Sequence, residues 1–568
     1  MNIVALLIAA VIQPLWPEGA MPYPQDHQIA APSQQVKTPG FDPFTHKAPY
    51  LEWSEPPANP NGAVMILISG GAYNNTCDGP AFQPLEKQLK DNGVTCVWLW
   101  YRTPRPKGLP YYQSAWADGQ RAIRLVRSQA AAKGLDPERI GIMGMSAGGH
   151  LTVLLATSSQ TPAYEPVDAT DRISCHANWA IAQSPAYLLT DGLGKQNSRE
   201  GDMIDVKLDD CFKFDAKTCP MVLMHGSKDV YSPNGSAQVY RQLRRMKIPA
   251  EVHFDADRIH CVLKPDRFER GLEFMRQMGF LGPVAKEVAL MDRFASDAAR
   301  GGYEKEMVWP EGKMPDVQTN QCVPYIEWHM PKTLKTKAIQ IIYSGGGYTG
   351  NKPDGFEVAP TRRYLNEKGM AVVTMKYRTP RPAAPLAKHT TAWQDLQRAI
   401  RLVRSKAAAK GLDPNRIGIM GSSAGGHLTL MGATSSMRRA YNPIDDLDKT
   451  VACNVQWAVA IYPAYALTDG AMKPNAQGGN EDDSRPVPEF SFDLKTCPVL
   501  FIHGDADGWA AMNSVKCWEQ LRRMGIQGEV HTLATRNHCF QRNAAPGTGS
   551  YTWNDRIWDF MTQKGFNK

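Results

Sequence analysis

The 568-residue sequence lacks the features that mark several special classes of protein. Its longest apolar run, Ile3 to Ile12, is about half of the roughly 20 residues that a membrane-spanning helix needs. The 64 basic and 56 acidic residues are spread along the chain without a basic block, so binding to nucleic acid is not indicated. The 11 cysteines form no CxxC pair and no Cys/His cluster spaced like a zinc site. We therefore expect no membrane span, no nucleic-acid partner, and no metal or cofactor.

The apolar run at the N-terminus has the pattern of an export signal. The small residues Ala9 and Ala10 lie near its end, as in a secretory signal peptide, although no Lys or Arg precedes it. This pattern predicts a signal peptide over residues 1–15 and a secreted or periplasmic protein. The alternative is that the run forms a buried N-terminal strand.

An internal repeat organises the rest of the chain. The 32 residues from Arg121 to Thr152 return from Arg398 to Thr429 with three differences, a shift of 277 positions. Shorter matches flank this segment in the same order, including YRTPRP, KTCP and WPEGxMP. The period is far longer than that of a solenoid repeat, so each copy should fold as a domain with its own core.

The repeat also places the domain boundaries. The WPEGxMP motif starts at Trp16 in the first copy and at Trp309 in the second. Because the motif belongs to both copies, we expect signal cleavage before it, near Ala10. The apolar spacing between the copies favours a connecting helix. The predicted parts are a domain over residues 16–282, a helical linker over 283–308 and a domain over 309–568.

Each copy alternates predicted strands with predicted helices. Apolar runs that end in glycine indicate strands, such as Val64 to Ile68, and the longest helical pattern runs from Gln113 to Lys133. This alternation is typical of an α/β protein with a mostly parallel sheet covered by helices on both faces. In such proteins the loops at the carboxyl ends of the strands carry the chemistry.

Both copies contain a GxSxG motif directly after a predicted strand and before a predicted helix. The central serines are Ser146 and Ser423. A nucleophilic serine on such a sharp turn needs glycine two residues to either side, because side chains there would clash with the neighbouring strand and helix. The N-terminus of the helix also favours developing negative charge. The motif therefore predicts one nucleophile in each copy.

A serine hydroxyl is a weak nucleophile, so a histidine must take its proton and an acid must orient that histidine. Both residue types follow the serine in each copy, separated from each other by 31 positions. The order Ser, Asp, His is that of an α/β-hydrolase rather than of chymotrypsin-like or subtilisin-like enzymes. The predicted catalytic residues are Ser146, Asp229 and His260 in the first copy, and Ser423, Asp507 and His538 in the second.

Glycine-rich loops supply an oxyanion hole in this interpretation. SGGAY and SGGGY follow the first strong strand of each copy and lack bulky side chains where backbone N–H groups must face a substrate. The predicted donors are the N–H groups of Gly71, Ala72 and Ala147, and those of Gly346, Gly347 and Ala424.

Other polar residues near these motifs have structural interpretations. His150 and His427 lie four residues after the serines and are expected to be packed histidines rather than bases. Asp118 and Arg121 have the spacing of an i,i+3 pair on a helix, worth only a few tenths of a kcal/mol.

These motifs together resemble the α/β-hydrolase superfamily, in particular its esterase/lipase branch. A strand followed by SGG[AG]Y, then YRTPRP, DPxRIGIMGxSAGGHL, HGxxD and a late histidine, occurs once in each copy. The WPxG openings and SAGGHL elbows are similar to those of secreted bacterial carbohydrate esterases of the acetyl xylan and feruloyl esterase kind. One departure is that Ser69 and Ser344 stand where the branch usually has His, which bears on the subfamily more than on catalysis.

The resemblance implies a secreted serine esterase that hydrolyses acetyl or feruloyl esters on plant polysaccharide through an acyl-enzyme. A serine peptidase uses the same residues, although a copy of ~260 residues leaves no room for the propeller or large cap that such peptidases usually have. A further alternative is one catalytic domain with a non-catalytic, carbohydrate-binding copy. The sequences of the copies diverge where residues 195–210 of the first correspond to residues 473–489 of the second, and we expect the substrate pockets to differ there.

Overall fold

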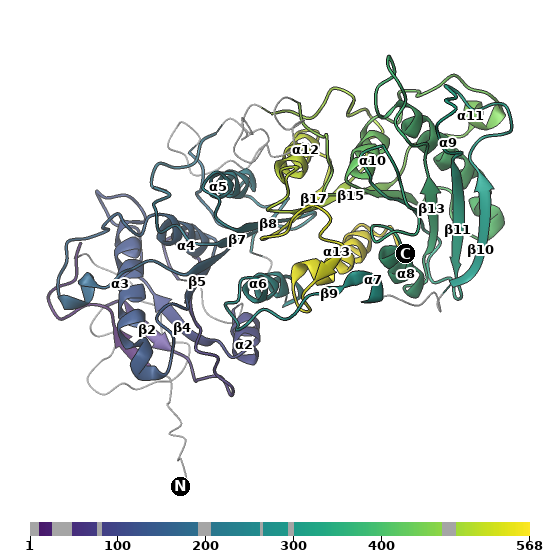
Figure 1. Ribbon diagram of the computed structural model, residues 1–568. Helices are drawn as coiled ribbons and strands as arrows, with labels where there is room; N and C mark the ends of the chain where they lie inside the picture. Colours follow the sequence, from purple (N-terminus) through teal and green to yellow (C-terminus); the bar gives the residue numbers. More distant parts are fainter. Residues whose placement is uncertain are drawn as a thin grey trace, which may run out of the picture. The chain divides into compact units, whose positions relative to one another are not determined.

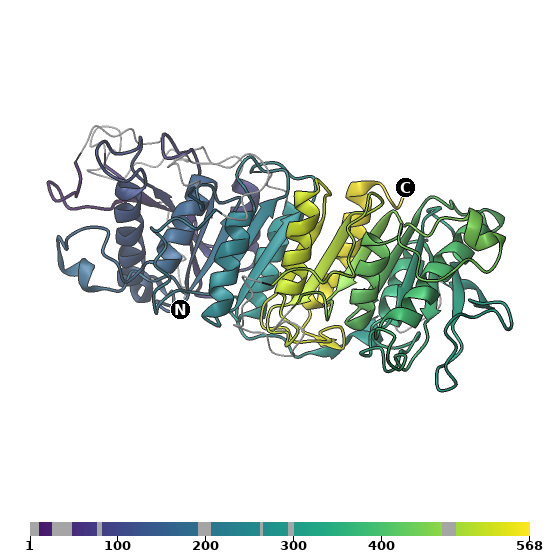
Figure 2. The same ribbon diagram turned by 90° about the horizontal axis from the view of Figure 1, so that it is seen from above.

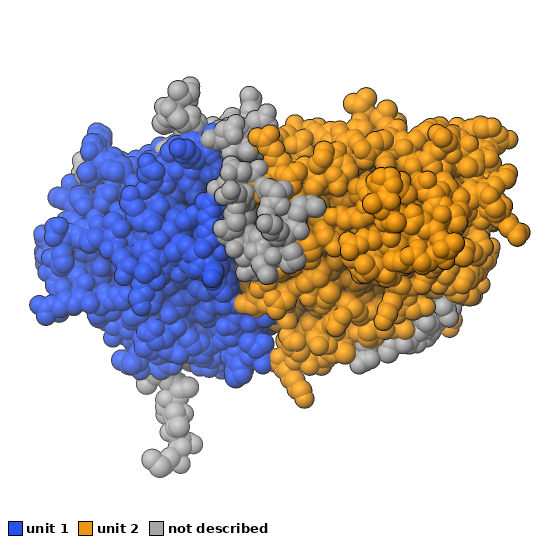
Figure 3. Space-filling view, turned by 45° about the horizontal axis from the view of Figure 1, so that its top comes forward, with its two compact units in different colours: residues 1–284 blue, residues 285–568 orange. Residues whose placement is uncertain are grey.

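The computed structural model describes residues 11–24, 48–76, 82–190, 206–261, 265–293, 300–468 and 484–568. The chain divides into two compact units, residues 1–284 and 285–568, which are coloured separately in Figure 3. Each unit contains one copy of the repeat. No helix in the described part of the chain is both long enough and apolar enough to cross a membrane.

The strands of unit 1 follow the spatial order β1-β2-β4-β3-β5-β6-β7-β8. From β4 to β8 neighbouring strands are parallel, whereas β1 and β2 join the edge next to β4 in antiparallel pairing. The strands are β1 (Val11–Pro14), β2 (Tyr50–Trp53), β3 (Val64–Ile68), β4 (Thr95–Trp100), β5 (Ile140–Met145), β6 (Trp179–Gln183), β7 (Met221–Gly226) and β8 (Ala250–Asp255).

Helices cover both faces of the unit 1 sheet. Figure 1 shows α3, α4 and α5 on one face and α2 and α6 on the other, and in Figure 2 the first group lies over the strands. Every residue of β3, β4 and β5 is buried, as expected for parallel strands covered on both sides. The helices are α2 (Gln83–Asp91), α3 (Gln113–Ala130), α4 (Ala147–Thr157), α5 (Asn234–Arg245) and α6 (Pro265–Gln277).

Unit 2 repeats this arrangement with the order β10-β11-β13-β12-β14-β15-β16-β17. Its first two strands are again antiparallel and the others parallel. The strands are β10 (Arg300–Met307), β11 (Tyr325–Pro331), β12 (Ile339–Tyr343), β13 (Ala371–Lys376), β14 (Ile417–Ser422), β15 (Trp457–Ile461), β16 (Val499–Gly504) and β17 (Glu529–Leu533).

The helices of unit 2 also lie on both faces of its sheet (Figure 1). One face has α9 (Thr390–Ala407), α10 (Ala424–Thr434), α11 (Asp446–Thr450) and α12 (Met512–Arg523), and the other has α7 (Leu290–Arg293), α8 (Ala359–Glu367) and α13 (Gly549–Lys564). A two-stranded ribbon joins β9 (Val288–Ala289) to β18 (Asn543–Ala544). The predicted α/β fold, with a mostly parallel sheet in each of two tandem copies, is confirmed.

The structure differs from the predicted boundaries at the start of each unit. Among the described residues of the predicted helical linker over 283–308, the only helix is the four-residue α7, and the end of the segment forms strand β10, which pairs with β11. Residues 1–10 of the predicted signal peptide lie outside the described residues, but residues 11–14 form β1, which pairs with β2. A signal that ends at residue 15 would therefore remove a strand of the unit 1 sheet.

The predicted helix pair between Asp118 and Arg121 is wrong. Asp118 accepts hydrogen bonds from the Arg102 backbone N–H at 2.9 Å and from the Trp16 indole at 2.8 Å, and pairs with the Arg102 guanidinium at 2.8 Å. Both charged side chains are fully buried. Arg121 instead binds Asp168 and Asp171. The helical spacing did not reveal that α3 turns Asp118 toward the sheet.

Unit 2 contains the same buried group. Asp395 accepts from the Trp309 indole at 2.7 Å and from the Arg378 backbone N–H at 2.8 Å, and its pair with the Arg378 side chain is also fully buried. This contact explains why the tryptophan of WPEG and the first arginine of YRTPRP recur in both copies. They are the two donors that satisfy one buried carboxylate, which would otherwise be costly to bury.

Replacing either aspartate by alanine should strongly destabilise its own unit. We expect Asp118→Ala or Asp395→Ala to lower the free energy of unfolding by about 3 to 5 kcal/mol, because the arginine is left buried without its partner. Denaturant unfolding followed by circular dichroism measures the loss. Asp91→Ala is the matched control: its pair with Lys87 is exposed, so it should cost less than about 0.5 kcal/mol. Equal losses in the buried and exposed variants would contradict this assignment.

Candidate active sites

The two GxSxG serines occupy a strained turn between a strand and a helix. Ser146 connects β5 to α4 with φ 58° and ψ −121°, and Ser423 connects β14 to α10 with φ 56° and ψ −120°. A positive φ is unfavourable for a residue with a side chain, so the surrounding packing must impose it. This backbone directs each serine away from the sheet, at the carboxyl end of a central parallel strand.

The glycines on either side of the serine are required by close packing of the backbone. A Cβ on Gly148 would lie 2.3 Å from the carbonyl oxygen of Ile68, and one on Gly425 would lie 2.6 Å from that of Ser344. In unit 1 the Cβ on Gly148 would also lie 2.4 Å from the carbonyl oxygen of Ser69, so in both units it would meet the serine that starts the glycine-rich loop. The elbow and this loop lie against each other without side chains between them.

The predicted catalytic residues of unit 1 meet at this elbow. The Nε2 atom of His260 lies 2.8 Å from the Ser146 hydroxyl oxygen, and its Nδ1 atom lies 2.8 Å from a carboxylate oxygen of Asp229. Asp229 is fully buried, whereas the side chain of His260 is 23% exposed. The acid is thus shielded from water, while the imidazole is partly accessible to solvent.

Unit 2 has the same geometry. The Nε2 atom of His538 lies 2.8 Å from the Ser423 hydroxyl oxygen, and its Nδ1 atom lies 2.7 Å from Asp507. Sequence order alone predicted both sets of residues, and both are brought within hydrogen-bonding distance, although each histidine is more than 110 residues from its serine.

A second histidine touches each acid. His225 contacts Asp229 at 3.2 Å, and His503 contacts Asp507 at 3.4 Å. Burial alone would raise the pKa of both aspartates, but the neighbouring histidines outweigh it and lower the pKa of Asp507 to about 2. The pKa of Asp229 is likewise held well below its usual range against the effect of burial. Both carboxyl groups are therefore ionised at neutral pH, as a group that orients an imidazole must be.

The predicted oxyanion loops lie beside the serines. In unit 1 Gly71 has φ 123° and Ala72 has φ 56°, and in unit 2 Gly346 and Gly347 have φ 96° and 63°. These left-handed conformations fold the loop back on itself over the elbow. The other predicted donors, Ala147 and Ala424, begin α4 and α10, where the first N–H groups of a helix have no acceptor within it.

His150 and His427 support these loops rather than reacting. The Nδ1 atom of His150 lies 2.8 Å from the Tyr73 hydroxyl, and that of His427 lies 2.8 Å from the Tyr348 hydroxyl. Both histidines are fully buried. Because each tyrosine directly follows its oxyanion loop, the histidine connects the helix after the nucleophile to that loop.

A buried polar network behind the nucleophile of unit 2 was not predicted. Glu357 accepts the Gly345 N–H at 2.8 Å and the Tyr462 hydroxyl at 3.1 Å. Ser422 donates to the side-chain oxygen of Gln541 at 3.0 Å, and the Tyr462 hydroxyl oxygen also lies within hydrogen-bonding distance of that oxygen. Burial raises the pKa of Glu357. The network therefore stabilises the start of the glycine-rich loop from within the unit.

The first copy lacks every side chain of this network. At the positions equivalent to Glu357, Ser422, Tyr462 and Gln541, it has Ala81, Met145, Ser184 and Leu263. Ala81 and Leu263 lie outside the described residues. The four differences occur together. All four hydrogen-bonded side chains of unit 2 are replaced in the first copy by smaller or apolar residues. Position-by-position comparison of the copies would have revealed the exchange, although not the contacts.

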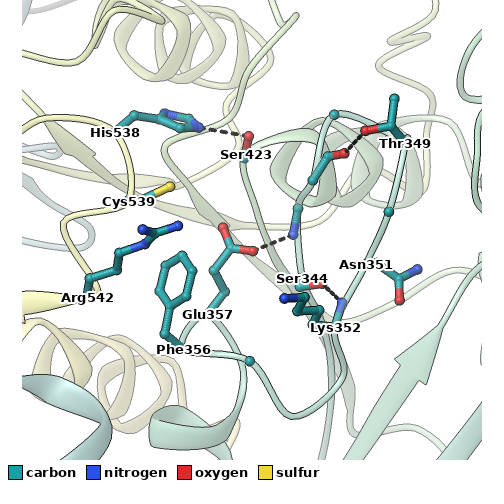
Figure 4. A pocket seen from close by; sticks show the side chains of 15 residues that line it. Ser344, Thr349, Asn351, Lys352, Phe356, Glu357, Ser423, His538, Cys539 and Arg542 are labelled. Atoms are coloured by element: carbon teal, nitrogen blue, oxygen red, sulfur yellow. Dashed lines mark hydrogen bonds between the residues drawn. The ribbon is translucent and has the colours of Figure 1, made fainter.

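A cavity of about 550 Å³ opens beside Ser423. Figure 4 shows the hydroxyl of Ser423 directed at His538, with the Glu357 carboxylate close by. Lys352 and Arg542 also line the cavity. The volume is typical of a site for a small ligand or for one residue of a polymer. Most of the predicted divergent segments, residues 195–205 and 473–483, lie outside the described residues.

The fold and the two elbows define an α/β-hydrolase. A model of the BD-FAE family matches residues 54–183 and 326–490, which together are more than half of the chain and include both serines. The chain belongs to the BD-FAE family, and the predicted resemblance to α/β-hydrolase esterases in two tandem copies is confirmed.

Individual relatives match shorter stretches. Esterase LipQ of Mycobacterium tuberculosis is 35% identical over 20% of this chain and 27% of its own length. An acetylxylan esterase of Xylanibacter ruminicola is 35% identical over 18% of this chain and 21% of its own length. The chain thus spans about a quarter of the length of these curated relatives. A solved acetyl ester-xyloside bifunctional hydrolase from Caldicellulosiruptor lactoaceticus is 24% identical, with all of that chain matched to 49% of this one at a TM-score of 0.37.

The depressed pKa of Asp507 predicts a specific loss of stability in acid. An aspartate with a pKa of about 2 when folded and about 3.9 when unfolded adds on the order of 2 to 3 kcal/mol above pH 4. This contribution is lost as the pH falls from about 4 to about 2, because the unfolded state then binds the proton first. Denaturant unfolding at a series of pH values measures it. Asp507→Asn should lack this pH dependence, and an identical acid profile in both proteins would contradict the prediction.

Proposed function

We propose that each unit is a serine esterase that hydrolyses carboxylic esters through an acyl-enzyme. The observation that carries this proposal is the chain of short contacts from aspartate to histidine to serine, present in both units. The matches to curated esterases support it. The steps of this mechanism use the side chains and backbone groups described above, together with water.

In the first half of the reaction, the Nε2 atom of His260 takes the proton of Ser146 as the serine oxygen attacks the ester carbonyl. The negative charge that forms on the carbonyl oxygen is stabilised by the N–H groups of Gly71, Ala72 and Ala147. His260 then gives its proton to the departing alcohol, which leaves an acyl group on the serine. Asp229 keeps the imidazole in the required tautomer and stabilises its charged form.

In the second half, His260 takes a proton from water, which attacks the acyl-serine, and the acid is released as the serine regains its proton. Ser423, His538 and Asp507 perform the same steps in unit 2, with Gly346, Gly347 and Ala424 as donors. A strained elbow suits this chemistry, because it holds the serine oxygen in position before substrate arrives.

We further propose that the substrates are acetyl or feruloyl esters of plant polysaccharide and that the protein is exported. The match to an acetylxylan esterase supports the substrate class. Because residues 11–14 belong to the unit 1 sheet, cleavage of a signal is expected before Val11. That site agrees with the cleavage near Ala10 predicted from the repeat.

A fluorophosphonate, which labels only an activated serine, tests the mechanism. Peptide mapping after reaction of the full chain should find two adducts, on Ser146 and Ser423. His260→Ala and His538→Ala should each slow labelling of their own unit by on the order of 10⁴-fold, because the serine loses its base. A single adduct on the wild type would assign the silent unit to binding or structure. No adduct on the folded protein would overturn the esterase proposal.

The Glu357 network should influence turnover in unit 2. In the background Ser146→Ala, where only unit 2 acts, Glu357→Ala should lower kcat for an acetyl ester about tenfold, because the Gly345 N–H loses its acceptor and the adjoining oxyanion loop loosens. Glu357→Gln retains a carbonyl acceptor and should recover most of the activity. Steady-state kinetics measure the change. A rise in KM with unchanged kcat, or an equal fall in kcat in both variants, would contradict a role in positioning the loop.

A further inference from the structure

Two histidines and a glutamate of unit 2 converge at a point that the proposed esterase mechanism does not use. His389 precedes the first residue of α9, His427 lies in the first turn of α10, and Glu489 lies in the segment between β15 and β16. Their potential ligand atoms all lie within 4.8 Å of one another. His389 and His427 are 38 residues apart in the sequence, and His427 and Glu489 are 62 residues apart. No ligand motif of short spacing therefore predicts the group.

The distances within this group suit a tetrahedral metal ion. A carboxylate oxygen of Glu489 lies 3.5 Å from the Nε2 atom of His427 and 3.9 Å from the Nδ1 atom of His389. Two ligands of a tetrahedral Zn²⁺ are about 3.3 Å apart, given metal–ligand bonds of about 2.0 to 2.1 Å. Small side-chain rotations would therefore bring all three ligand atoms onto one ion.

The two imidazole nitrogens are buried without a hydrogen-bond partner among the described residues. This holds for Nδ1 of His389 and Nε2 of His427, both directed toward the carboxylate but outside hydrogen-bonding geometry. His427 is fully buried. A buried polar atom that is left unpaired costs free energy, so each such atom in a native protein calls for a partner. A bound cation would supply that partner to both nitrogens at once.

The contact of the other nitrogen of His427 is compatible with the tautomer that a metal needs. Its Nδ1 atom lies 2.8 Å from the Tyr348 hydroxyl. If Nδ1 carries the proton and donates it to Tyr348, Nε2 is a free lone pair directed at Glu489. Metal-binding histidines usually have their second nitrogen held in this way by a neighbouring acceptor.

Glu489 is also held in place. Its backbone carbonyl accepts hydrogen bonds from the Ser435 hydroxyl at 2.9 Å and from the Arg438 guanidinium at 2.8 Å. Its side chain is 23% exposed and that of His389 is 12% exposed, so an ion can enter from solvent. Three protein ligands leave a fourth position for water.

Unit 1 provides a natural comparison, because two of the three proposed ligands are replaced there. Tyr112 stands in place of His389, and Cys211 in place of Glu489. His150 corresponds to His427, but its Nε2 atom lies 3.2 Å from the hydroxyl of Tyr111. In unit 2 that tyrosine is replaced by Lys388. The nitrogen that has a partner in one copy is unpaired in the other. Of the three exchanges around it, two introduce the ligands His389 and Glu489, and the third, to Lys388, removes the tyrosine that is its partner in unit 1.

From this geometry we infer that His389, His427 and Glu489 bind one divalent cation, with Zn²⁺ the best fit to two imidazoles and a carboxylate. The ion connects the start of α9, the first turn of α10 and the segment that precedes β16. Through His427 and Tyr348 it also supports the predicted oxyanion loop of unit 2. This inference stands independently of the esterase proposal.

The test uses the full chain after dialysis against a chelator. Isothermal titration with Zn²⁺ alone should show one site per chain, and metal analysis after gel filtration should recover about one Zn²⁺. Titration with Co²⁺ should give the visible bands of a tetrahedral site without the charge-transfer band of a thiolate ligand. That spectrum separates the proposed site from binding by the cysteines, of which the described ones are free thiols.

Two substitutions on different elements remove ligands. His389→Tyr introduces the residue type of the first copy, and Glu489→Gln preserves shape without charge, so both should fold and both should weaken Zn²⁺ binding at least 100-fold. Cys211→Ser, at the equivalent position of unit 1, should leave affinity and stoichiometry unchanged. Thermal unfolding without metal checks that each variant is folded.

Three outcomes would overturn the inference. They are a wild-type protein that binds no Zn²⁺, a Co²⁺ spectrum dominated by thiolate bands, and a site that both ligand substitutions leave intact. Since all of these are binding measurements, they are independent of whether the serines are active.

Discussion

A buried carboxylate in each unit fixes the frame on which the site is built. Asp118 joins the tryptophan that opens the unit, the arginine that follows β4, and the long helix α3, although Trp16 and Asp118 are 102 residues apart. Its counterpart Asp395 makes the same contacts in unit 2. A charge this deeply buried is stable only with its full set of partners. The edge of the sheet, the loop after β4 and the helix that packs beside α4 therefore have one arrangement relative to each other.

Within that frame, close contact between backbone segments positions the predicted nucleophilic serine. Gly148 and Gly425 allow the helix after the elbow to touch the start of the glycine-rich loop, and a side chain at either position would separate them. Ser146 and Ser423 have their strained positive φ directly beside this contact. Strain, oxyanion loop and helix N-terminus are thus consequences of one packing arrangement, which is why these features occur together in both copies.

The two units share this arrangement and differ in what surrounds it. Behind the nucleophile, unit 2 has the hydrogen-bonded side chains of Glu357, Tyr462 and Gln541 where the first copy has smaller or apolar residues. Beside the oxyanion loop, His389 and Glu489 replace a tyrosine and a cysteine. The residues that both units share form the elbow and the contacts of its serine. The residues that differ lie behind the elbow and beside the predicted oxyanion loop. The residues that surround the two sites therefore differ between the copies, while the sites themselves are alike.

The sequence by itself determined the duplication, the α/β class and the residues expected at each site. These follow from local patterns: apolar runs ending in glycine, a GxSxG turn between strand and helix, and the order of serine, aspartate and histidine in two copies. The edge strand β10 was not predicted, and an N-terminal strand was predicted only as the alternative to a signal peptide, because a short strand of mixed polarity has no clear period.

Only the tertiary structure decided the contacts between residues far apart in the chain. Asp118 has the helical spacing of a partner for Arg121, yet packing turns it toward Arg102. Glu357 carries no motif, and its importance appears only where the fold brings Tyr462 and the Gly345 N–H to it. The convergence of His389, His427 and Glu489 likewise depends on two helix N-termini and a loop meeting at one point. A sequence pattern shows the residue types but does not predict these tertiary contacts, because burial and hydrogen bonding are properties of the folded chain.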